Sequence, residues 1–234
     1  MPAHTDQPGP DARLTRQQVA WRAAQDLADG NYVNLGIGLP VLVANYAPEN
    51  IEVIFQSENG IVGVGPVASD NMADPDLVDA GSQRVTLRPG GAIVDSAAAF
   101  AMIRGGHIDL TLLGGFEVAS NGDFANWDLG ASPKGQLVGG AMDLAAGAKD
   151  VRVLMTHTTK TGAPRLLERC NLSLTAVGVV KRVYTDLAVL DIRDGGFVVR
   201  QMVPTMTEEA LQNLTGAPLV FDEPCGPLIC PDLS

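Results

Sequence analysis

A glutamate that follows a short apolar run holds the position in this sequence where chemistry is most expected. Glu58 comes after residues 51–55, a run that favours a β-strand, and directly before Asn59 and Gly60, which favour a tight turn. Open α/β sheets bind ligands at the carboxyl ends of their strands. A carboxylate held there can act as a base, a hydrogen-bond acceptor or a nucleophile. The residues alone do not choose among these roles, and an ordinary loop glutamate has the same pattern.

A Gly-Ile-Gly turn at residues 36–38 is the second candidate, because it follows a strand expected at residues 32–37. It resembles the start of a dinucleotide-binding fingerprint, and Glu58 stands near the place of the ribose-binding acid. The third glycine of that fingerprint is missing, since position 41 is valine, and two nearby prolines leave room only for a short helix. Binding of NAD is therefore a minor alternative.

A glycine pair before an expected helix is the third candidate. Gly139 and Gly140 precede a helix expected at residues 141–148, which begins with Ala141. Backbone N–H groups at such a position can bind an anion or stabilise a developing oxyanion. A tight turn with close packing has the same residues, so the pair supports a binding site only together with other features.

The composition excludes several classes of function. The net charge is −11, whereas a protein that binds nucleic acid or an anionic membrane needs a basic surface. Three cysteines without a Cys-x-x-Cys pair, and three distant histidines, predict neither a disulfide framework nor a metal-ligand cluster. The polar start has no signal-peptide pattern, and no apolar run reaches the length of a membrane span. We expect a cytoplasmic protein.

The elements that must position these residues alternate between strands and helices. A helix begins after Thr15, with Gln18 at the capping-box spacing. Further strands are expected at residues 51–55, 85–87, 108–113, 151–155, 183–192 and 197–203, and helices at 40–46, 92–104, shortly after 163 and at 207–215, with a long loop at 63–83. This alternation predicts an α/β fold, a largely parallel open sheet with helices on both faces. The chain divides into a mobile tail (1–13), one domain (14–220) and a loose C-terminal tail (221–234).

Several segments, taken in order, resemble the B subunit of the family I, 3-oxoacid-type, coenzyme A transferases. They are NLGIGLP (34–40), QSENGIVGVGP (56–66), DLVDAG (76–81), FAMIRGGHIDLTLLGGFEV (100–118), DFANW (123–127) and GGAMDLAAGAKDV (139–151). The resemblance covers residues 14–220, and the SENG segment together with GGAMD at this separation is specific. It implies the CoA-transferase fold, and it makes Glu58 a catalytic residue rather than a loop glutamate.

The resemblance implies a covalent mechanism for Glu58. Its carboxylate would attack the thioester of an acyl-CoA and later carry CoA as a glutamyl-CoA thioester, with ping-pong kinetics. Gly140 and Ala141 would line the site near the carbonyl oxygen, Asn126 would be a polar neighbour of the glutamate, and Asn59 with Gly60 would shape the turn. Coenzyme A would be a substrate, and no cofactor is implied.

One departure from the family concerns coenzyme A binding. Many members carry a lysine after the AG of DLVDAG that is expected to contact CoA, and this sequence has Ser82 there. The family also implies an A-type subunit that completes the pocket in a hetero-oligomer, so this chain alone is expected to be inactive.

The acid substrate is suggested by the segment between Trp127 and Gly139. It is longer than in members that use acetoacetate, which favours 3-oxoadipate, with succinyl-CoA as the donor, although the QSENG segment is more like the acetoacetate type. Lys134 would then meet the distal carboxylate of the acid. The competing interpretation from another class is a ligand-sensing α/β module without catalysis, since a fold alone does not prove a function.

Overall fold

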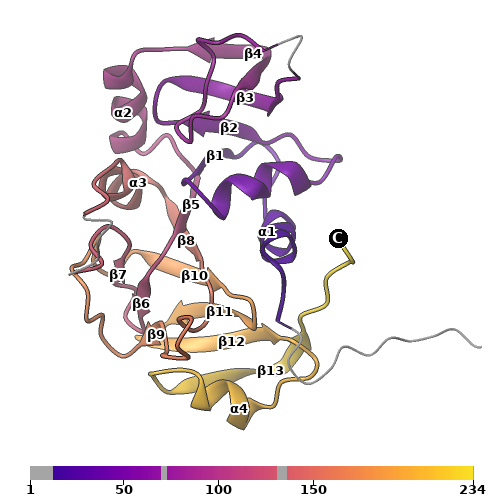
Figure 1. The fold of residues 1–234 in the computed structure, drawn as a ribbon, viewed down its shortest axis with the longest axis vertical. Coiled ribbons are helices and arrows are strands. Elements are labelled where there is room, and N and C mark those ends of the chain that lie inside the picture. The colour runs from indigo at the N-terminus through magenta and orange to yellow at the C-terminus, as the bar shows by residue number, and fades with distance from the viewer. Residues whose placement is uncertain (1–12, 70–72, 131–135, 234) are drawn as a thin grey trace, which may run out of the picture.

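The centre of the molecule is a sheet of ten strands (Figure 1). A computed structural model of the chain describes residues 13–69, 73–130 and 136–233. The strand order is β13-β12-β11-β10-β8-β5-β1-β2-β3-β4. The inner strands run parallel to one another: β1 (Tyr32–Leu35), β2 (Ile54–Ser57), β5 (Leu110–Gly114), β8 (Asp150–Leu154) and β10 (Val180–Tyr184). The predicted parallel sheet is confirmed for this inner part.

Helices cover both faces of the inner strands, which is why these strands are nearly unbroken apolar runs. Helix α1 (Arg16–Ala24) packs against β8, β10 and the 3₁₀ helix η1 (Pro40–Tyr46). Helices α2 (Ser96–Arg104) and α3 (Ala141–Gly147) pack against each other, and they lie on the opposite side of the sheet from α1 (Figure 1). Val33, Leu112 and Val153 on neighbouring strands are fully buried between these layers.

The capping box predicted at the start of α1 is confirmed. The Thr15 side chain accepts a hydrogen bond from the Gln18 backbone N–H, and the Gln18 side chain accepts one from the Thr15 N–H. Two of the four N–H groups left open at a helix start are thereby satisfied. Helix α1 therefore begins at a defined residue, which places Arg16 in its first turn.

One flank of the sheet is formed by antiparallel strands that were expected to be partly loop. Strand β3 (Ile61–Val67) pairs with β2, and β4 (Val85–Ile93) pairs with β3. The predicted loop at 63–83 is therefore wrong for residues 63–67. Its glycines serve close strand contact rather than a loop, because a Cβ on Gly65 would lie 2.4 Å from the Thr86 hydroxyl oxygen.

The other flank corrects the predicted loose tail. Strands β11 (Ala188–Arg193) and β12 (Gly196–Met202) form a hairpin around Asp194 and Gly195, both of which have positive φ. Strand β13 (Leu219–Pro227) then pairs in parallel with β12, and Leu228 is buried. The prediction of a loose tail from residue 221 is therefore wrong for 221–227. Prolines in this segment misled the prediction, but an edge strand tolerates residues without an N–H donor.

A second, three-stranded sheet lies beside the main one and corrects another predicted element. It consists of β6 (Glu117–Ala119), β7 (Phe124–Ala125) and β9 (Leu166–Leu167). The short helix predicted after residue 163 is absent from the described chain there, because Leu166 pairs with Val118 and is fully buried. The last helix, α4 (Glu208–Asn213), is confirmed, with Thr207 as its N-cap.

Two further findings concern the N-terminal segment and the absence of membrane-spanning helices and metal-binding clusters among the described residues. Arg13, the last residue of the predicted mobile tail, forms an ion pair with Asp186 at 2.9 Å, and the rest of that tail lies outside the described residues. Within the described ranges, no helix is long and apolar enough to cross a membrane, and no group of histidine, cysteine and acidic side chains is arranged to hold a metal ion.

Candidate active site

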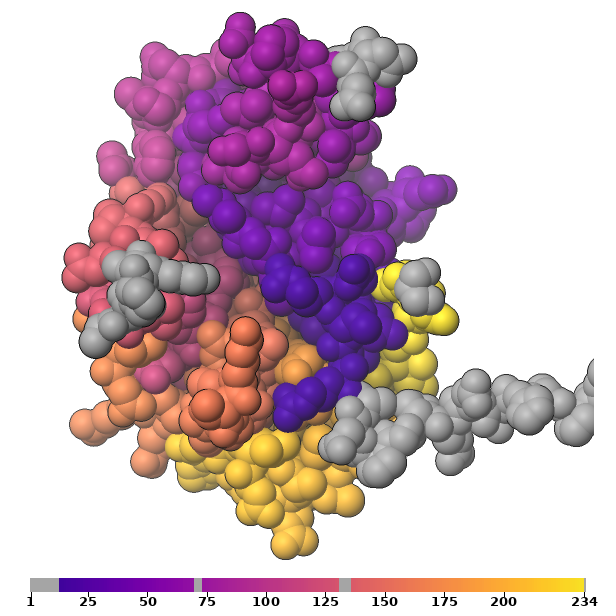
Figure 2. Space-filling view, in the orientation of Figure 1, coloured from indigo at the N-terminus to yellow at the C-terminus, as the bar shows by residue number. Residues whose placement is uncertain are grey.

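A cavity of about 560 Å³ opens where β1, β2, β5 and β8 end. Its lining comes from the residues that follow these strands, from the start of α1 and from the segment 137–144. In the space-filling view the surface is hollowed between α1, in indigo, and the pink and orange segments that follow β5 and β8 (Figure 2). Strand β1 has β2 as its neighbour on one side and β5 on the other, so the strand order changes direction at β1. Open α/β sheets bind ligands at such a point.

Glu58 enters this cavity from the turn that ends β2, as predicted. Gly60 holds the turn with φ +122°, and a Cβ there would lie 2.1 Å from the Val94 carbonyl oxygen. Only glycine fits such a position without a clash. Its N–H donates to the Ser57 carbonyl oxygen at 3.0 Å and its own carbonyl accepts from Val94 at 2.8 Å. The turn therefore presents Glu58 in a defined direction.

The glycine pair before α3 lies against Glu58. A Cβ on Gly140 would stand 3.2 Å from the Glu58 Oε1 atom and 3.2 Å from the Phe100 ring. Gly140 and Ala141 both line the cavity with Glu58. The structure thus brings Glu58 together with the glycine motif that the sequence suggested as a separate candidate, and the lack of a side chain at Gly140 leaves room beside the carboxylate.

The surroundings of Glu58 raise the pKa of its carboxyl group above the ordinary value. Burial is the largest cause, and the negative charge of Asp79 acts in the same direction. The side-chain amide of Asn34 and the backbone N–H of Glu58 act against it, because both stabilise the ionised carboxylate. The half-buried carboxylate is therefore poorly solvated and more basic than a surface glutamate, as suits a nucleophile.

Asn34 is a site residue that sequence reasoning did not select. It is fully buried on β1, and its Nδ2 atom donates to the Gln56 side-chain oxygen at 2.7 Å and to the Gln56 carbonyl at 3.1 Å. Gln56 and Thr111 lie beside it in register on the adjacent strands. The Oδ1 atom of Asn34 and the hydroxyl of Thr111 are buried and have no hydrogen-bond partner among the residues that the structure describes. A polar row therefore crosses the sheet beneath the catalytic candidate.

The other predicted residues fall into different places. Asn126 lines the cavity, where its Nδ2 donates to the Gly114 carbonyl at 3.1 Å and its Oδ1 accepts from Thr175 at 2.7 Å. Asn59 is exposed and is not a cavity residue; its Nδ2 donates to the Val78 carbonyl at 2.7 Å and ties the turn to the segment 74–83. Lys134 lies outside the described residues.

Two further observations bear on the alternatives. The Gly-Ile-Gly turn at 36–38 leads into the 3₁₀ helix η1, with Pro40 at its start, rather than into the α-helix that binds pyrophosphate in the NAD fingerprint. Ser82 is exposed, with φ +63°, and does not line the Glu58 cavity. The geometry therefore gives no support to the NAD alternative.

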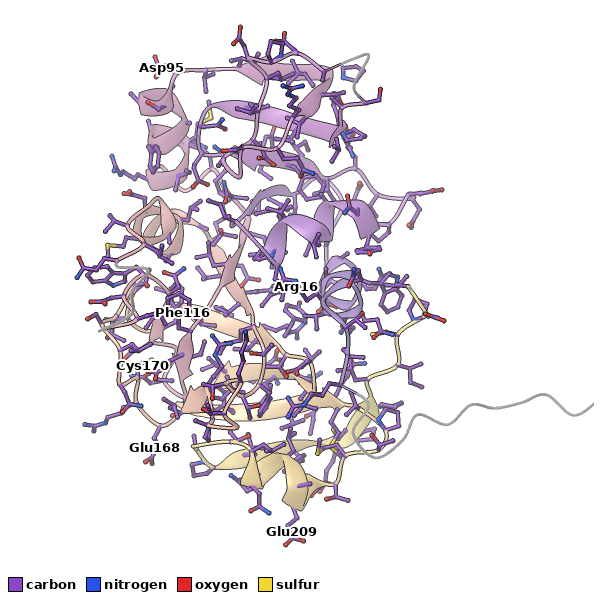
Figure 3. All side chains as sticks on the ribbon, viewed as in Figure 1. Arg16, Asp95, Phe116, Glu168, Cys170 and Glu209 are labelled. Atoms are coloured by element: carbon purple, nitrogen blue, oxygen red, sulfur yellow. The ribbon has the colours of Figure 1, made fainter. Side chains whose placement is uncertain are left out.

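Two arginines complete the charged lining of the cavity. Arg16 enters from the start of α1, and Arg165 comes from the segment before β9. Figure 3 marks Arg16 and, across the opening, Phe116, which also lines the cavity. Sequence reasoning did not select either arginine, because isolated basic residues in loops and first turns carry no signature of their own.

Comparison with known proteins identifies the class to which this fold and site belong. The family described as Coenzyme A transferase matches residues 16–214. The chain belongs to this family, and its curated relatives include B-type subunits. It is 48% identical over 208 residues to the B subunit of the 3-oxoadipate CoA-transferase of Pseudomonas putida, a match that covers 89% of this chain and 97% of that protein.

Two other relatives have similar identity. The B subunit of the probable succinyl-CoA:3-ketoacid coenzyme A transferase of Bacillus subtilis is 46% identical over 203 residues, covering 86% of this chain and 93% of that protein. The beta subunit of the acetate CoA-transferase of Escherichia coli is 49% identical over 183 residues, covering 77% and 82%. The chain is therefore a member of a family of CoA-transferring enzymes, as its sequence segments predicted.

Solved structures share the fold at low identity. The acyl-CoA transferase apoenzyme of Escherichia coli O157:H7 matches with a TM-score of 0.73 at 19% identity, over 92% of this chain. This chain spans less than half of that one, 43% of its length. The decarboxylase AibA/AibB matches with a TM-score of 0.66 at 18% identity, over 93% of this chain and 90% of that one. The CoA-transferase fold is confirmed, and its site rather than its fold must decide the reaction.

Proposed function

We propose that this chain is the B subunit of a 3-oxoacid CoA-transferase in which Glu58 carries CoA as a glutamyl-CoA thioester. The observation that carries the proposal is the position of Glu58. It is the one carboxylate among the described residues that line the cavity, and it faces the open backbone of Gly140. A carboxylate with free space beside it at a strand end can attack an electrophile that enters the cavity.

The proposed reaction proceeds in two exchanges. A Glu58 oxygen attacks the thioester carbonyl carbon of the donor, the carbon–sulfur bond breaks, and CoA leaves as a thiolate. The thiolate then attacks the Glu58 carbonyl carbon of the resulting anhydride, and the donor acid leaves as a carboxylate. Glu58 now holds CoA as a thioester, and the acceptor acid reverses both steps. No water, cofactor or redox partner is consumed.

The neighbours of Glu58 support this chemistry. The acyl oxygen becomes negatively charged during each attack, and the backbone around Gly140 and Ala141 lies at the carboxylate where such a charge would develop. Asn126 supplies a polar group to the cavity lining and is held in place by Gly114 and Thr175. Binding energy from the body of CoA would drive the covalent steps.

The names of the relatives support a proposal for the substrates and the partner. We propose succinyl-CoA as the donor and a 3-oxo acid as the acceptor, with 3-oxoadipate first and acetoacetate second, because relatives at 48% and 46% identity are named as 3-oxoadipate and succinyl-CoA:3-ketoacid transferases. Both relatives are named as B subunits, which implies an A-type partner, and we propose that this partner covers the open side of the cavity. A cytoplasmic location and the absence of nucleic acid and membrane partners stay predictions.

A mass spectrum of the peptide that contains Glu58 tests the proposal. The chain is co-expressed with an A-type subunit, incubated with succinyl-CoA and treated with borohydride, which reduces a thioester. We expect a reduced product at Glu58 that is absent without acyl-CoA. Glu58→Gln should lose the adduct and lower kcat by roughly 1,000-fold or more. Glu52→Gln, an exposed site before β2, is the matched control and should keep both.

The absence of an adduct at Glu58 would contradict the proposal. A well-folded complex that binds succinyl-CoA but forms no adduct at Glu58 would remove the nucleophile assignment. The ligand-sensing alternative would then account for the cavity, and Glu58→Gln should bind the same ligand as the wild type.

A further inference from the structure

The charge inside the cavity differs in sign from the charge of the whole chain. The chain carries a net charge of −11. Among the described residues that line the cavity, the charged side chains are Arg16, Glu58 and Arg165. Neither arginine forms an ion pair within 4.0 Å with any residue in the described ranges, and Asp186 and Glu117, whose charges act on Arg165, do not line the cavity. When Glu58 is converted to the proposed anhydride or thioester, its carboxylate loses its negative charge. The lining then presents two cations. Such a lining favours an acyl group that carries a negative charge of its own.

Arg165 is the better placed of the two arginines to bind an anion. Its guanidinium is half-buried and held by three uncharged oxygens: Nε donates to the Phe116 carbonyl at 2.9 Å, Nη1 to the Thr156 hydroxyl at 2.6 Å and Nη2 to the Gly115 carbonyl at 3.2 Å. A guanidinium has five N–H groups. One N–H therefore remains on each terminal nitrogen, a pair suited to a carboxylate.

Glu58 and Arg165 enter the cavity from strand ends that lie apart in the sheet. Glu58 follows β2, whereas the anchors of Arg165 follow β5 and β8, which are two and three strands away in the order β8-β5-β1-β2. Adjacent strands lie about 4.8 Å apart, so the backbones are separated by roughly 10–14 Å. Both side chains reach into the cavity between them. The cavity of about 560 Å³ that both side chains line has room for the carbon chain of a short dicarboxylic acid.

We infer that Arg165 binds the free carboxylate of a dicarboxylic acyl group while its other carboxyl carbon reacts at Glu58. This inference rests on the proposed function and deepens it, because it names the residue that selects dicarboxylic over monocarboxylic acids. It assigns to a described residue the role that the sequence suggested for Lys134. Arg16, which is exposed at the cavity rim, adds to the attraction without a fixed contact.

The test compares two donors that share CoA and differ in the distal carboxylate. Rates of adduct formation at Glu58 are measured with succinyl-CoA and with butyryl-CoA, in the complex with the A-type subunit. The variants are Arg165→Met, which removes the positive charge, and Arg165→Lys, which keeps the charge but lacks the paired N–H donors of a guanidinium. Arg169→Met, an exposed arginine four positions on, is the matched control. We expect Arg165→Met to lose roughly 10- to 100-fold in kcat/KM with succinyl-CoA and little with butyryl-CoA. Arg165→Lys should recover part of the loss.

Each other outcome would overturn the inference. An equal loss with both donors would mean that Arg165 acts on CoA or only supports the loops it holds. No loss with either donor, or a wild-type complex that uses both donors equally well, would mean that no selection occurs at this residue. A wild-type complex that forms no adduct at all would overturn the proposed function as well, so the two failures are distinguishable.

Discussion

At the scale of single residues, the reactivity of Glu58 depends on groups that act on its carboxylate in opposite directions. Burial and the charge of Asp79 raise its pKa, whereas Asn34 and the backbone N–H of Glu58 stabilise the ionised form. Asp79 is itself fixed by the N–H groups of Gly81 and Gln83, at 2.8 Å each. The carboxylate is thus kept basic enough to attack and ionised enough to do so.

Replacing Asn34 should change the pH dependence of the reaction. In Asn34→Ala the stabilising effect of the Asn34 amide on the ionised Glu58 is lost, so the pKa of Glu58 should rise further and the acidic limb of the kcat/KM profile for succinyl-CoA should move to higher pH. Thr111→Val is the matched control, because it removes the neighbouring unpartnered hydroxyl without touching Glu58. An unchanged pH profile in Asn34→Ala, with lower activity at every pH, would reduce Asn34 to a structural residue.

At the scale of elements, the turn after β2 depends on the absence of a side chain at Gly60. Gly60→Ala should lower the free energy of unfolding by about 2–4 kcal/mol, because φ is +122° and a Cβ would overlap the Val94 carbonyl. Gly38→Ala is the control: φ is +97° but the space is open, so about 1 kcal/mol is expected. Urea unfolding measures both, and equal losses would show that strain in φ alone decides the cost.

A buried histidine joins the end of β8 to the segments around it and should make stability depend on pH. His157 is fully buried between the hydroxyls of Thr185 and Thr215, at 3.0 Å and 2.9 Å. Burial lowers the pKa of His157 to about 4, while the charge of Asp186 raises it and that of Arg13 lowers it. The ring is therefore neutral in the folded chain at pH values where the unfolded chain is protonated.

The sign and size of the His157 effect follow from that difference. The unfolded chain binds the proton near pH 6.5, so the free energy of unfolding should fall as the pH drops from 6.5 to 4, by about 3 kcal/mol in total. His157→Gln should remove this dependence, whereas His107→Gln, at an exposed site, should not. The same slope in wild type and His157→Gln would refute the assignment.

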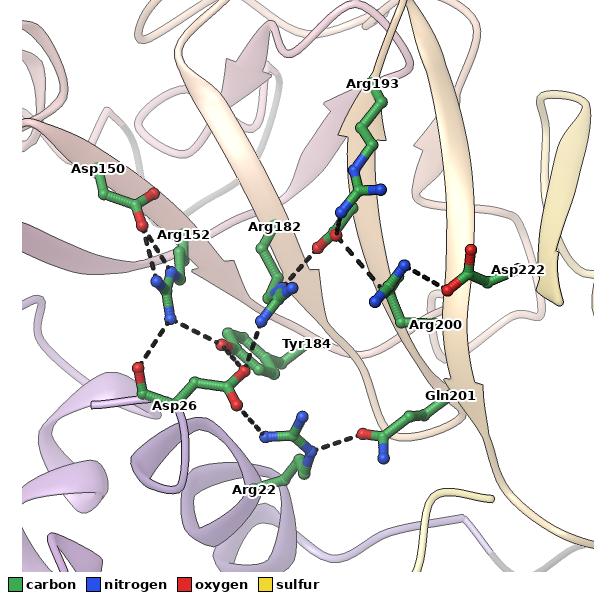
Figure 4. A network of polar contacts seen from close by, with 11 residues as sticks. Arg22, Asp26, Asp150, Arg152, Arg182, Tyr184, Arg193, Arg200, Gln201 and Asp222 are labelled. Atoms are coloured by element: carbon green, nitrogen blue, oxygen red, sulfur yellow. Dashed lines mark hydrogen bonds and ion pairs between the residues drawn. The ribbon is translucent and has the colours of Figure 1, made fainter. Parts of the chain in front are cut away.

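At the scale of the whole molecule, a polar network joins the first helix to the C-terminal half of the sheet (Figure 4). Asp26, just after α1, accepts hydrogen bonds from Arg22 at 2.8 Å, from Arg182 at 2.7 Å and from Tyr184 at 2.7 Å. The network continues from Arg182 to Asp191 on β11 and through Arg200 to β13. It holds α1, and with it the first turn at the cavity rim, on β8 and β10.

Removing the charge of Asp26 should loosen this connection. Burial alone would raise the pKa of Asp26, but hydrogen bonds from Arg22 and Tyr184 and the arginine charges lower it below the ordinary value of 3.8. Its contribution is therefore present above about pH 4 and is lost as the pH falls below that. Asp26→Asn should lose roughly 2–4 kcal/mol at pH 7. Asp143→Asn, which breaks an exposed pair with Arg104, should lose less than about 1 kcal/mol in the same urea titration.

What the sequence by itself determined was local. The capping box at Thr15, the strand that ends before Glu58 and the glycine turn after it depend on interactions between residues a few positions apart, so their patterns can be read directly. The family segments then gave Glu58 its expected role. The strand at 221–227 was missed because its stability comes from pairing with β12 rather than from its own residues.

Only the tertiary structure decided which distant residues meet. A buried polar residue such as Asn34 has the same local pattern whether it lies beneath a reactive carboxylate or within an ordinary core. Gly140 contacts Glu58, and Arg165 faces the same cavity, because parallel strands bring the ends of β2, β5 and β8 to one edge. Strand order is set by the packing of the whole sheet, and no local pattern along the chain encodes it.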